Sequence, residues 1–222
     1  MQHIPVIAID GPSGTGKGTL SHLLAQRLGW HELDSGALYR IVALAALRQH
    51  IAVDNVPALL ALTDTLNPHF EGGEVYCLGE KVTRDIRTEA CSQAASQIAK
   101  WPELRAALIG WQLRFRQSPG LVADGRDMGT VVFPDADLKF FIEATVQIRA
   151  ERRLKQLQGM GMDANLGELM AELNERDARD RQRAVSPLIP AEDAMIVDTS
   201  NRSVSDVFEL VWAVVSKHFG RV

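Results

Sequence analysis

The sequence predicts an α/β protein in which a parallel β-sheet is covered on both faces by helices. Short apolar segments alternate along the chain with amphipathic helical segments, as in sheets built with helical crossovers. The 222 residues are 46% hydrophobic and 23% charged, enough for one globular core with a small subdomain. No internal repeat, low-complexity tract or linker interrupts the chain, so we expect a single domain over residues 1–222 with two mobile appendages.

Five strand-like segments punctuate the chain. They lie at Val6–Ile9, Trp30–Leu33 (the shortest candidate), Leu121–Ala123, Leu138–Ile142 and Met195–Val197. Helical periodicity fills the intervals, at Leu20–Leu28, Ala37–Leu47, roughly Ala90–Gln117, Val146–Gln158, Leu166–Arg183 and Val204–His218. Because ligands of such sheets bind at the carboxyl ends of the strands, the residues that follow the strands are the candidates for function.

Two segments break the alternation. Asn67–Thr88 contains Gly72-Gly73 and Gly79-Glu80 turn signals around a short β-prone run, which predicts a small antiparallel insert. Gly159-Met160-Gly161 separates two helical patterns and is predicted to act as a hinge.

The segment that follows the first strand has the pattern of a phosphate-binding loop. Residues 11 to 19 read Gly-Pro-Ser-Gly-Thr-Gly-Lys-Gly-Thr and lead directly into a helix. Glycines let backbone N–H groups approach phosphate oxygens, Lys17 adds a positive charge, and the helix presents its positive N-terminus. A flexible glycine turn with an exposed lysine is the alternative, but the strand–loop–helix context favours a bound polyphosphate.

Position 18 departs from many loops of this kind, which place Ser or Thr beside the lysine as a magnesium ligand. Here Gly18 precedes Thr19, the form seen in nucleoside monophosphate kinases, so position 18 offers no hydroxyl to a metal. We therefore expect Mg²⁺ to be held mainly through nucleotide phosphates and water, with no direct protein ligand assigned.

Polar motifs follow the next two strands. In Asp34-Ser35-Gly36-Ala37-Leu38-Tyr39-Arg40, Ser35 is expected to cap a helix and Tyr39 to lie one turn further on the same face. A plain cap with surface side chains explains that stretch equally well. In Ala123-Asp124-Gly125-Arg126-Asp127-Met128-Gly129-Thr130, Asp124 resembles the acidic strand end that faces magnesium in phosphate-loop enzymes. A surface ion pair of Arg126 and Asp127 is the weaker alternative, because both follow a strand.

The two helical segments after the fourth strand are rich in arginine. Arg149, Arg152 and Arg153 lie off the apolar face of the first segment. In the second, a stripe of leucines continues at helical spacing as charged residues (Leu166, Leu169, Leu173, then Arg176, Asp180, Arg183). A solvated helix end with i,i+4 ion pairs is the alternative. The nearby glycine hinge and the other arginines favour a lid that closes over phosphates.

The bulk properties exclude several classes of function. A net charge of −4 and a pI of about 5.9 argue against a general nucleic-acid or membrane-surface binder. Cys77 and Cys91 lack metal-ligand spacing, and the six histidines are scattered. With no signal-like N-terminus and no apolar run long enough to cross a bilayer, we expect a cytoplasmic protein with reduced thiols, monomeric by default.

Taken together, the motifs Ile9–Thr19, Asp34–Arg40, Asp124–Thr130 and Arg176–Arg181 closely resemble bacterial cytidylate kinases, of the P-loop nucleoside monophosphate kinase superfamily. The resemblance runs nearly end to end. It implies a five-stranded parallel sheet flanked by helices, a monophosphate-binding insert at about 67–88 and a helical lid at about 152–185. It implies phosphoryl transfer from ATP to the small-molecule substrates CMP and dCMP, with Mg²⁺.

The resemblance also implies residue roles. ATP would be held by Gly11, Pro12, Ser13, Gly14, Thr15, Gly16, Lys17, Gly18 and Thr19. The acceptor CMP would contact Ser96, Arg105 and Asp127 with its base, Arg40 and Arg126 with its phosphate, Asp180 and Arg183 with its sugar, and Ser35 and Tyr39 along the pocket. Catalysis would depend on Lys17, Asp124, Arg152, Arg153 and Arg176.

Two other interpretations explain less of the chain. A nucleotide-switch module would be supported by a guanine-reading Asn-Lys-x-Asp run, which the sequence lacks. A small-metabolite kinase of the same architecture, of the shikimate or dephospho-coenzyme-A type, gives no reason for Asp34–Arg40 or for the insert.

Overall fold

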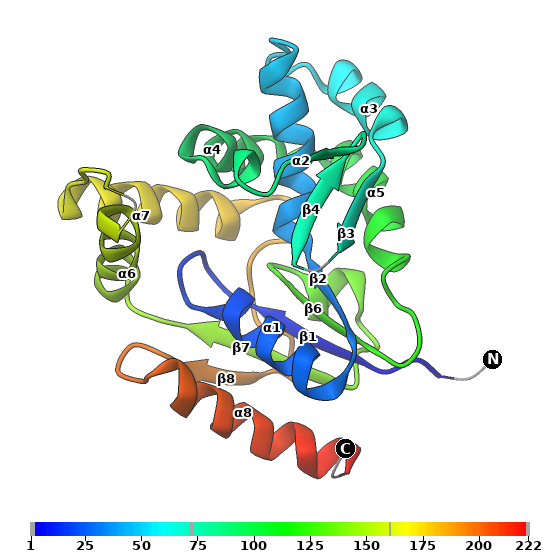
Figure 1. Cartoon of the computed structure of the whole chain (residues 1–222), viewed down its shortest axis with the longest axis vertical. Coiled ribbons are helices and arrows are strands. Elements are labelled where there is room, and N and C mark those ends of the chain that lie inside the picture. The colour runs from blue at the N-terminus through cyan, green and yellow to red at the C-terminus, as the bar shows by residue number, and fades with distance from the viewer. Residues whose placement is uncertain (1–2, 72, 160, 221–222) are drawn as a thin grey trace. The chain divides into compact units, whose positions relative to one another are not determined.

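A computed structural model describes residues 3–71, 73–159 and 161–220 of the chain (Figure 1). Two compact units are distinguished, one formed by Met1–Leu33 with Phe115–Val222 and the other by Asp34–Arg114. Gly72 of the predicted insert and Met160 of the predicted hinge lie outside the described residues. The single-domain organisation and the limits of the lid stay predictions.

The first unit is built on a five-stranded sheet, as predicted. Its strand order is β2-β6-β1-β7-β8. β1 pairs in parallel with β6 on one side and β7 on the other, and β7 pairs in parallel with β8. The strands are β1 (Val6–Asp10), β2 (His31–Asp34), β6 (Leu121–Gly125), β7 (Leu138–Glu143) and β8 (Met195–Asp198). The central strand β1 is buried along its whole length, which places its carboxyl end and the following loop at the middle of the sheet edge.

Helices α1 (Lys17–Leu28) and α8 (Val204–Phe219) cover one face of this sheet (Figure 1). In α8, Val207, Val211 and Val215 recur every fourth residue, so they form one buried stripe. They pack with α1 leucines and with the residues of β1 that point to this side, Ile7 and Ile9. Each fully buried aliphatic side chain stabilises the fold by about 1.5–3 kcal/mol, so this layer anchors the helix that follows the phosphate-binding loop.

Two further helices follow β7 in the same unit. α6 (Val146–Gly159) and α7 (Leu166–Gln182) pack against each other beyond the carboxyl end of β7 (Figure 1). α7 begins after Asn165, whose side chain accepts hydrogen bonds from the N–H groups of Gly167 and Glu168. The predicted arginine-rich helical pair is thereby confirmed as a pair of helices.

The second unit combines helices with a small antiparallel sheet. Its elements are α2 (Ser35–Arg48), α3 (Val56–Thr65), β3 (Pro68–Glu71), β4 (Glu74–Cys77), β5 (Glu80–Lys81), the 3-10 helix η1 (Asp85–Arg87), α4 (Glu89–Ile98) and α5 (Pro102–Leu113). β4 pairs antiparallel with both β3 and β5, which confirms the predicted insert. Arg48 of α2 donates to Glu80 at 2.9 Å and to Asp85 at 2.7 Å, and so ties the insert to a helix of its own unit.

Three local predictions were wrong. The helical pattern expected over Ala90–Gln117 is two helices, because Pro102 has no N–H to donate and starts α5 instead of continuing α4. Helix α3 was not predicted, although Asn55 caps it and a proline stands in its first turn. The cap of α2 is Asp34 and not Ser35: the Asp34 carboxylate accepts the N–H of Ala37 at 3.0 Å.

A short π-helical turn, η2 (Met128–Val132), follows β6. Among the described residues, no helix combines the length and apolar character that crossing a bilayer requires.

Candidate functional site

The backbone of the loop after β1 requires glycine at three positions. Gly11, Gly14 and Gly16 have φ values of 149°, 81° and 91°, in the region that side chains disfavour. A Cβ at Gly11 would lie 2.1 Å from the carbonyl oxygen of Ile142, so the loop passes directly over β7. Gly18 has no such restriction, because it is helical and nothing lies within 4 Å of its would-be Cβ.

Lys17 folds back over the loop that precedes it. Its ammonium donates to the carbonyl of Pro12 at 3.0 Å, and the Thr15 hydroxyl donates to the same carbonyl at 3.2 Å. The lysine side chain is buried, and its charge opposes a part of the rise that burial causes in the pKa of the nearby Asp10. The positive charge is therefore held at the loop and not in bulk solvent.

Side chains from later parts of the chain donate hydrogen bonds to two further loop carbonyls, those of Ser13 and Thr15. Arg149 donates to the carbonyl of Ser13 at 3.0 Å, while the Thr199 hydroxyl donates to that of Thr15 at 3.0 Å and Arg152 adds a longer bond at 3.4 Å. In a trans peptide the C=O and the following N–H point in opposite directions. Bonds that pull these carbonyls outward therefore turn the next N–H groups the other way, as an anion cradle requires.

Two buried aspartates end the neighbouring strands β1 and β6. Ile9 and Asp124 are partners in register, so Asp124 points to the face of the sheet that carries Ile9 and α1. Asp10 points to the other face, where its two oxygens accept the N–H groups of Met128 and Gly129, both at 2.8 Å. Burial raises the pKa of Asp10 to about 6, against the lowering effect of these two bonds.

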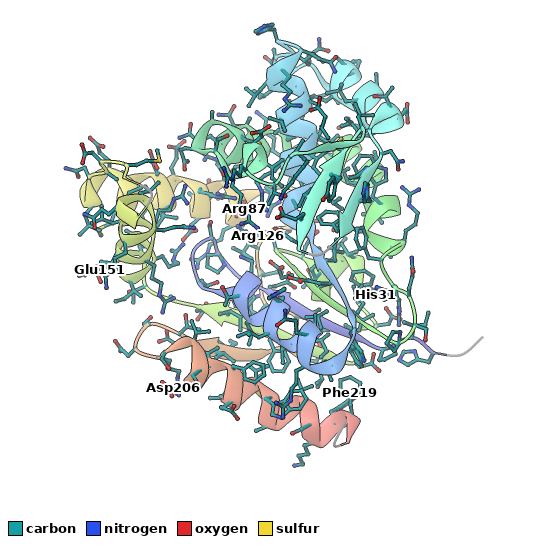
Figure 2. All side chains as sticks on the ribbon, in the orientation of Figure 1. His31, Arg87, Arg126, Glu151, Asp206 and Phe219 are labelled. Atoms are coloured by element: carbon teal, nitrogen blue, oxygen red, sulfur yellow. The ribbon has the colours of Figure 1, made fainter. Side chains whose placement is uncertain are left out.

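Arg126, labelled in Figure 2, lies in the turn after β6. It forms a largely buried ion pair with Asp180 of α7. Arg126 Nε donates to Asp180 Oδ2 at 2.8 Å, and Arg126 Nη1 donates to the carbonyl of Gly125 at 3.1 Å. Burial alone would lower the pKa of Arg126, but the charges of Asp180, Asp124 and Asp10 raise it overall. The guanidinium is thus a permanent cation with a fixed orientation.

Asp180 is also surrounded by arginines of its own helix end. Arg183 lies 3.5 Å from Asp180 and donates its Nε to the Asp180 carbonyl at 3.2 Å. Burial would raise the pKa of Asp180, but the charges of Arg126, Arg183 and Arg176 lower it overall. Three arginines thus surround the Asp180 carboxylate, and an anionic ligand could pair with the guanidinium groups of this cluster.

In the second unit, Arg40 is fixed by the cap of its own helix. Its Nη2 donates to Asp34 Oδ2 at 2.6 Å, while the other oxygen of Asp34 caps α2. The Nε of Arg40 is buried and has no hydrogen-bond partner among the residues that the structure describes. A buried donor without an acceptor is costly, so an acceptor supplied by a ligand would stabilise it.

Tyr39 and Arg105 lie together in the same unit. The Arg105 guanidinium carbon is 5.6 Å from the centre of the Tyr39 ring, and Arg105 Nη1 donates to the carbonyl of Ala99 at 3.3 Å. Both side chains are buried, as are Ser35 at the start of α2 and Ser96 on α4, which packs against α2. Planar and hydroxyl groups of this kind are suited to reading a flat polar ring.

Comparison with known proteins decides the family. A family model described as cytidylate kinase matches residues 7–217. The chain belongs to the cytidylate kinase family. Cytidylate kinases of Aeromonas salmonicida and Aeromonas hydrophila are each 52% identical to it, over 99% and 100% of this chain and 97% and 98% of theirs. That of Shewanella putrefaciens is 49% identical over 97% of this chain and 96% of its own.

Similar solved structures are more distant. Shikimate kinase from Bacteroides thetaiotaomicron aligns over 97% of this chain and 98% of its own at 14% identity, with a TM-score of 0.48.

From the sequence, Mg²⁺ is expected to be held mainly through nucleotide phosphates and water. In the described ranges, no group of three or more His, Cys, Asp or Glu side chains could enclose an ion. Asp124, buried at the end of β6, is the carboxylate on the α1 side of the sheet. A hard cation could be held by phosphates and water with this carboxylate nearby.

The structure brings most of the predicted residues of the cytidylate kinase pattern into two groups, one in each unit. In the first unit, Lys17 and Arg152 contact the loop, and Arg126, Asp180 and Arg183 form one charged cluster. Arg152 also donates to the carbonyl of Thr199 at 2.6 Å and to its hydroxyl at 3.2 Å. Arg153 instead donates to Gln156 of its own helix at 3.0 Å. Asp127 is buried, and its carbonyl accepts the N–H groups of Val131 and Val132.

Sequence reasoning missed four residues that shape the first group. Asp10 holds the turn after β6, Thr199 and Arg149 hold the loop, and Asp177 holds Arg149. An acidic residue at the end of the most buried strand is a signal that could have identified Asp10. Asp177 stands within the motif Arg176–Arg181 and Arg149 among the arginines of its helical segment, but neither was given a role. Thr199 carries no signal, because it becomes a neighbour of the loop only through the fold.

Neither cysteine has the surroundings of a nucleophile. Cys91 is fully buried and donates its thiol to the carbonyl of Arg40 at 3.1 Å. Burial raises the pKa of Cys91 to about 11, so the thiolate is not populated at neutral pH.

Proposed function

We propose that this protein transfers the γ-phosphoryl group of ATP to CMP and dCMP, giving CDP and dCDP, as a nucleoside monophosphate kinase of pyrimidine metabolism. The proposal rests on sequence identity of 49–52%, over nearly the full chain, to several proteins named cytidylate kinase. The charged groups of both units support it, because a kinase of this kind must neutralise two phosphorylated ligands.

ATP is assigned to the loop Gly11–Thr19. Its backbone N–H groups and the N-terminus of α1 would receive the β- and γ-phosphate oxygens, and Lys17 would add a charge to them. Lys17 now donates to the carbonyl of Pro12, and that contact would be exchanged for a phosphate oxygen. Mg²⁺, when bound with ATP, would neutralise charge across the phosphates, and Asp124 would accept hydrogen bonds from its water.

The acceptor nucleotide is assigned to side chains of both motifs that follow β2 and β6. Arg40 and Arg126 would hold its phosphate, since guanidinium groups bind phosphate oxygens in a fixed fork. The buried Nε of Arg40 gives this assignment an unfilled donor. Asp180 and Arg183 would receive the sugar hydroxyls, and Ser35 and Tyr39 would line the pocket.

The base is assigned to Ser96, Arg105 and Asp127. A carboxylate such as that of Asp127 accepts a hydrogen bond from the exocyclic amine of cytosine, a group that uracil lacks. Arg105 and Ser96 would donate hydrogen bonds to the carbonyl oxygen and the unprotonated ring nitrogen of the same base.

Phosphoryl transfer requires that the two reacting phosphates be positioned in line and that their negative charge be neutralised. The acceptor phosphate oxygen attacks the γ-phosphorus in line, and the bond from that phosphorus to the β-phosphate oxygen breaks. Arg152, Arg153 and Arg176 would neutralise the transferring group together with Lys17. Arg152 would give up its bonds to Thr199 for this role.

We further infer that the enzyme works as a monomer in the cytoplasm. Size-exclusion chromatography tests the oligomeric state, and cell fractionation tests the location.

A coupled assay for ADP release tests the proposal. The purified protein is supplied with ATP, MgCl₂ and one acceptor at a time from CMP, dCMP, UMP, AMP, GMP and shikimate. CMP and dCMP are expected to give the highest kcat/KM, with UMP lower by about ten- to hundredfold, the discrimination of one good base contact. Fast turnover of shikimate, or ADP release that ignores the acceptor, would contradict the proposal.

A further inference from the structure

Helix α7 carries two buried carboxylates on one face, and each is paired with an arginine of a different element. Asp177 and Asp180 are three residues apart, so they lie on adjacent turns of the same side. Asp180 pairs with Arg126 of the turn after β6, at 2.8 Å. Asp177 pairs with Arg149 of α6 through both of its oxygens, at 3.1 and 2.5 Å.

Arg149 is a connector between α7 and the phosphate loop. It is 2% exposed, and its Nη1 donates both to Asp177 and to the carbonyl of Ser13 in the loop. Its Nε donates to the carbonyl of Ala144, just before α6. A Cβ at Gly14 would lie 3.2 Å from the Cβ of Arg149, so the loop also packs directly on this side chain. Because the protein occupies three of its nitrogens, Arg149 is unsuited to binding a phosphate itself.

We propose that Arg149 and Asp177 are positioning residues that couple occupancy of the phosphate loop to the placement of α7, and thereby to Arg126. This inference rests on the proposed function, in which the loop takes ATP and Arg126 takes the acceptor phosphate. Neither Arg149 nor Asp177 touches a substrate in that assignment. Their effect is on the energetic link between the two ligands.

A series of hydrogen bonds connects the phosphate loop to Arg126. A phosphate bound by the loop fixes its peptide groups, including the Ser13 carbonyl, and so fixes the Arg149 donor that holds this carbonyl. The fork geometry of the guanidinium then sets Asp177, and one helical turn later Asp180 sets Arg126. A helix is stiff over one turn, so the two ion pairs move together. By linkage, ATP then strengthens acceptor binding by the same factor by which the acceptor strengthens ATP binding.

The test measures that factor directly. The Kd of CMP is determined by calorimetry with MgCl₂, with and without saturating adenylyl imidodiphosphate, an ATP analogue that does not transfer its phosphate. In the wild type we expect CMP to bind at least about fivefold more tightly with the analogue present. The double variant R149M/D177L removes both buried charges at once, since loss of one partner alone would leave an uncompensated charge. It is expected to bring the ratio of the two Kd values below about two.

Two further variants separate coupling from general loss of structure. Glu175→Gln removes the exposed ion pair between Glu175 and Arg179 on the same helix and should keep the wild-type ratio. Arg149→Lys keeps the charge but loses the fork, so it should lower the ratio even if the double variant does not fold. Thermal unfolding of each variant establishes that the Kd values refer to folded protein.

The outcomes are distinct. The inference is overturned if the two Kd values of CMP are nearly equal in the wild type, or if a folded Arg149 variant shows the same ratio of Kd values as the wild type. In both cases, CMP binding by the wild type still supports the proposed function. A wild type that binds the analogue but not CMP overturns the proposed function, and the coupling with it. A lowered ratio in the Arg149 variants with an unchanged ratio in Glu175→Gln supports the inference.

Discussion

Asp180 Oδ2 accepts a hydrogen bond of 2.8 Å from Arg126 Nε, and both side chains are largely withdrawn from solvent. One residue lies on α7 and the other follows β6, 54 positions earlier. The carboxylate assigned to the sugar of the acceptor therefore also orients the arginine assigned to its phosphate. One face of the charged end of α7, with Asp177 and Asp180, is buried, while the other keeps the exposed i,i+4 ion pair of Glu175 and Arg179 that a solvated helix end would have.

Asp180→Ala is expected to weaken the acceptor in two ways. Arg126 loses its orienting partner, which affects CMP and dCMP alike, and the sugar hydroxyl contact is lost unequally, because only CMP has a 2′-hydroxyl. A hydrogen bond to a charged group is worth about 1.5–3 kcal/mol, so the ratio of kcat/KM for CMP and dCMP should change measurably. Kinetics with both acceptors measure it, and Glu175→Ala on the exposed side of α7 serves as control. An unchanged ratio would remove Asp180 from the sugar site.

Lys17→Ala should abolish most turnover while CMP binding stays nearly intact. The ammonium is held at the ATP loop, and loss of a transition-state charge contact costs about 3 kcal/mol or more, at least a hundredfold in rate. Steady-state kinetics and calorimetry with CMP test the two halves separately. If CMP affinity falls in parallel with kcat, the assignment of separate sites is wrong.

Asp127→Asn should reduce the preference for CMP over UMP. An amide can rotate to donate to the uracil carbonyl, whereas a carboxylate only accepts, and one base contact is worth about 1–3 kcal/mol of discrimination. The measurement is kcat/KM for both nucleotides in the wild type and the variant. Unchanged relative values would return Asp127 to a purely structural role in the turn after β6.

Gly11→Ala and Gly18→Ala form a matched pair within the loop motif. The first places a Cβ 2.1 Å from the Ile142 carbonyl oxygen at a φ of 149°, so it should lower the free energy of unfolding by several kcal/mol. The second adds a methyl group to an exposed helical position with nothing within 4 Å, and should raise stability by up to about 1 kcal/mol. Urea unfolding of the two variants measures both effects. Equal stability would contradict the close approach of the loop to β7.

Asp10→Asn tests the raised pKa of Asp10. The pKa is about 6 in the folded protein against 3.8 for a free side chain, so the folded state binds more protons between these values. The contribution of Asp10 to stability is therefore fully present below about pH 3.8 and is lost as the pH rises through 6. Between pH 5 and 7.5 the wild type should lose about 1.4 kcal/mol relative to the variant, which cannot titrate there. Urea unfolding at the two pH values measures the difference, and a constant difference would show that burial does not perturb Asp10.

Much of the architecture can be predicted from the sequence, because it depends on local patterns of apolar residues and glycines. Four of the five strand segments are mainly apolar runs, the exception being β2 with its sequence His-Glu-Leu-Asp, and the insert contains two glycine turn signals. The break before Pro102 was missed because apolar spacing continues across it, and α3 because its pattern is short. At the site, the loop motif predicts a phosphate cradle, but Thr199 and Arg149, which hold the loop carbonyls, come from the residue after β8 and from α6. No local pattern predicts contacts across such separations, and the assigned roles of the site residues stay predictions.

The outward-held loop carbonyls also set the order in which the chain can mature during synthesis. Thr15 and Thr199 are separated by 184 residues, and Ser13 and Arg149 by 136. The loop therefore leaves the ribosome early but receives the clamps that shape it only after β8 has been translated and paired. A nascent chain that already holds β1 and α1 therefore still lacks both of the side chains that hold the Ser13 and Thr15 carbonyls in the finished protein.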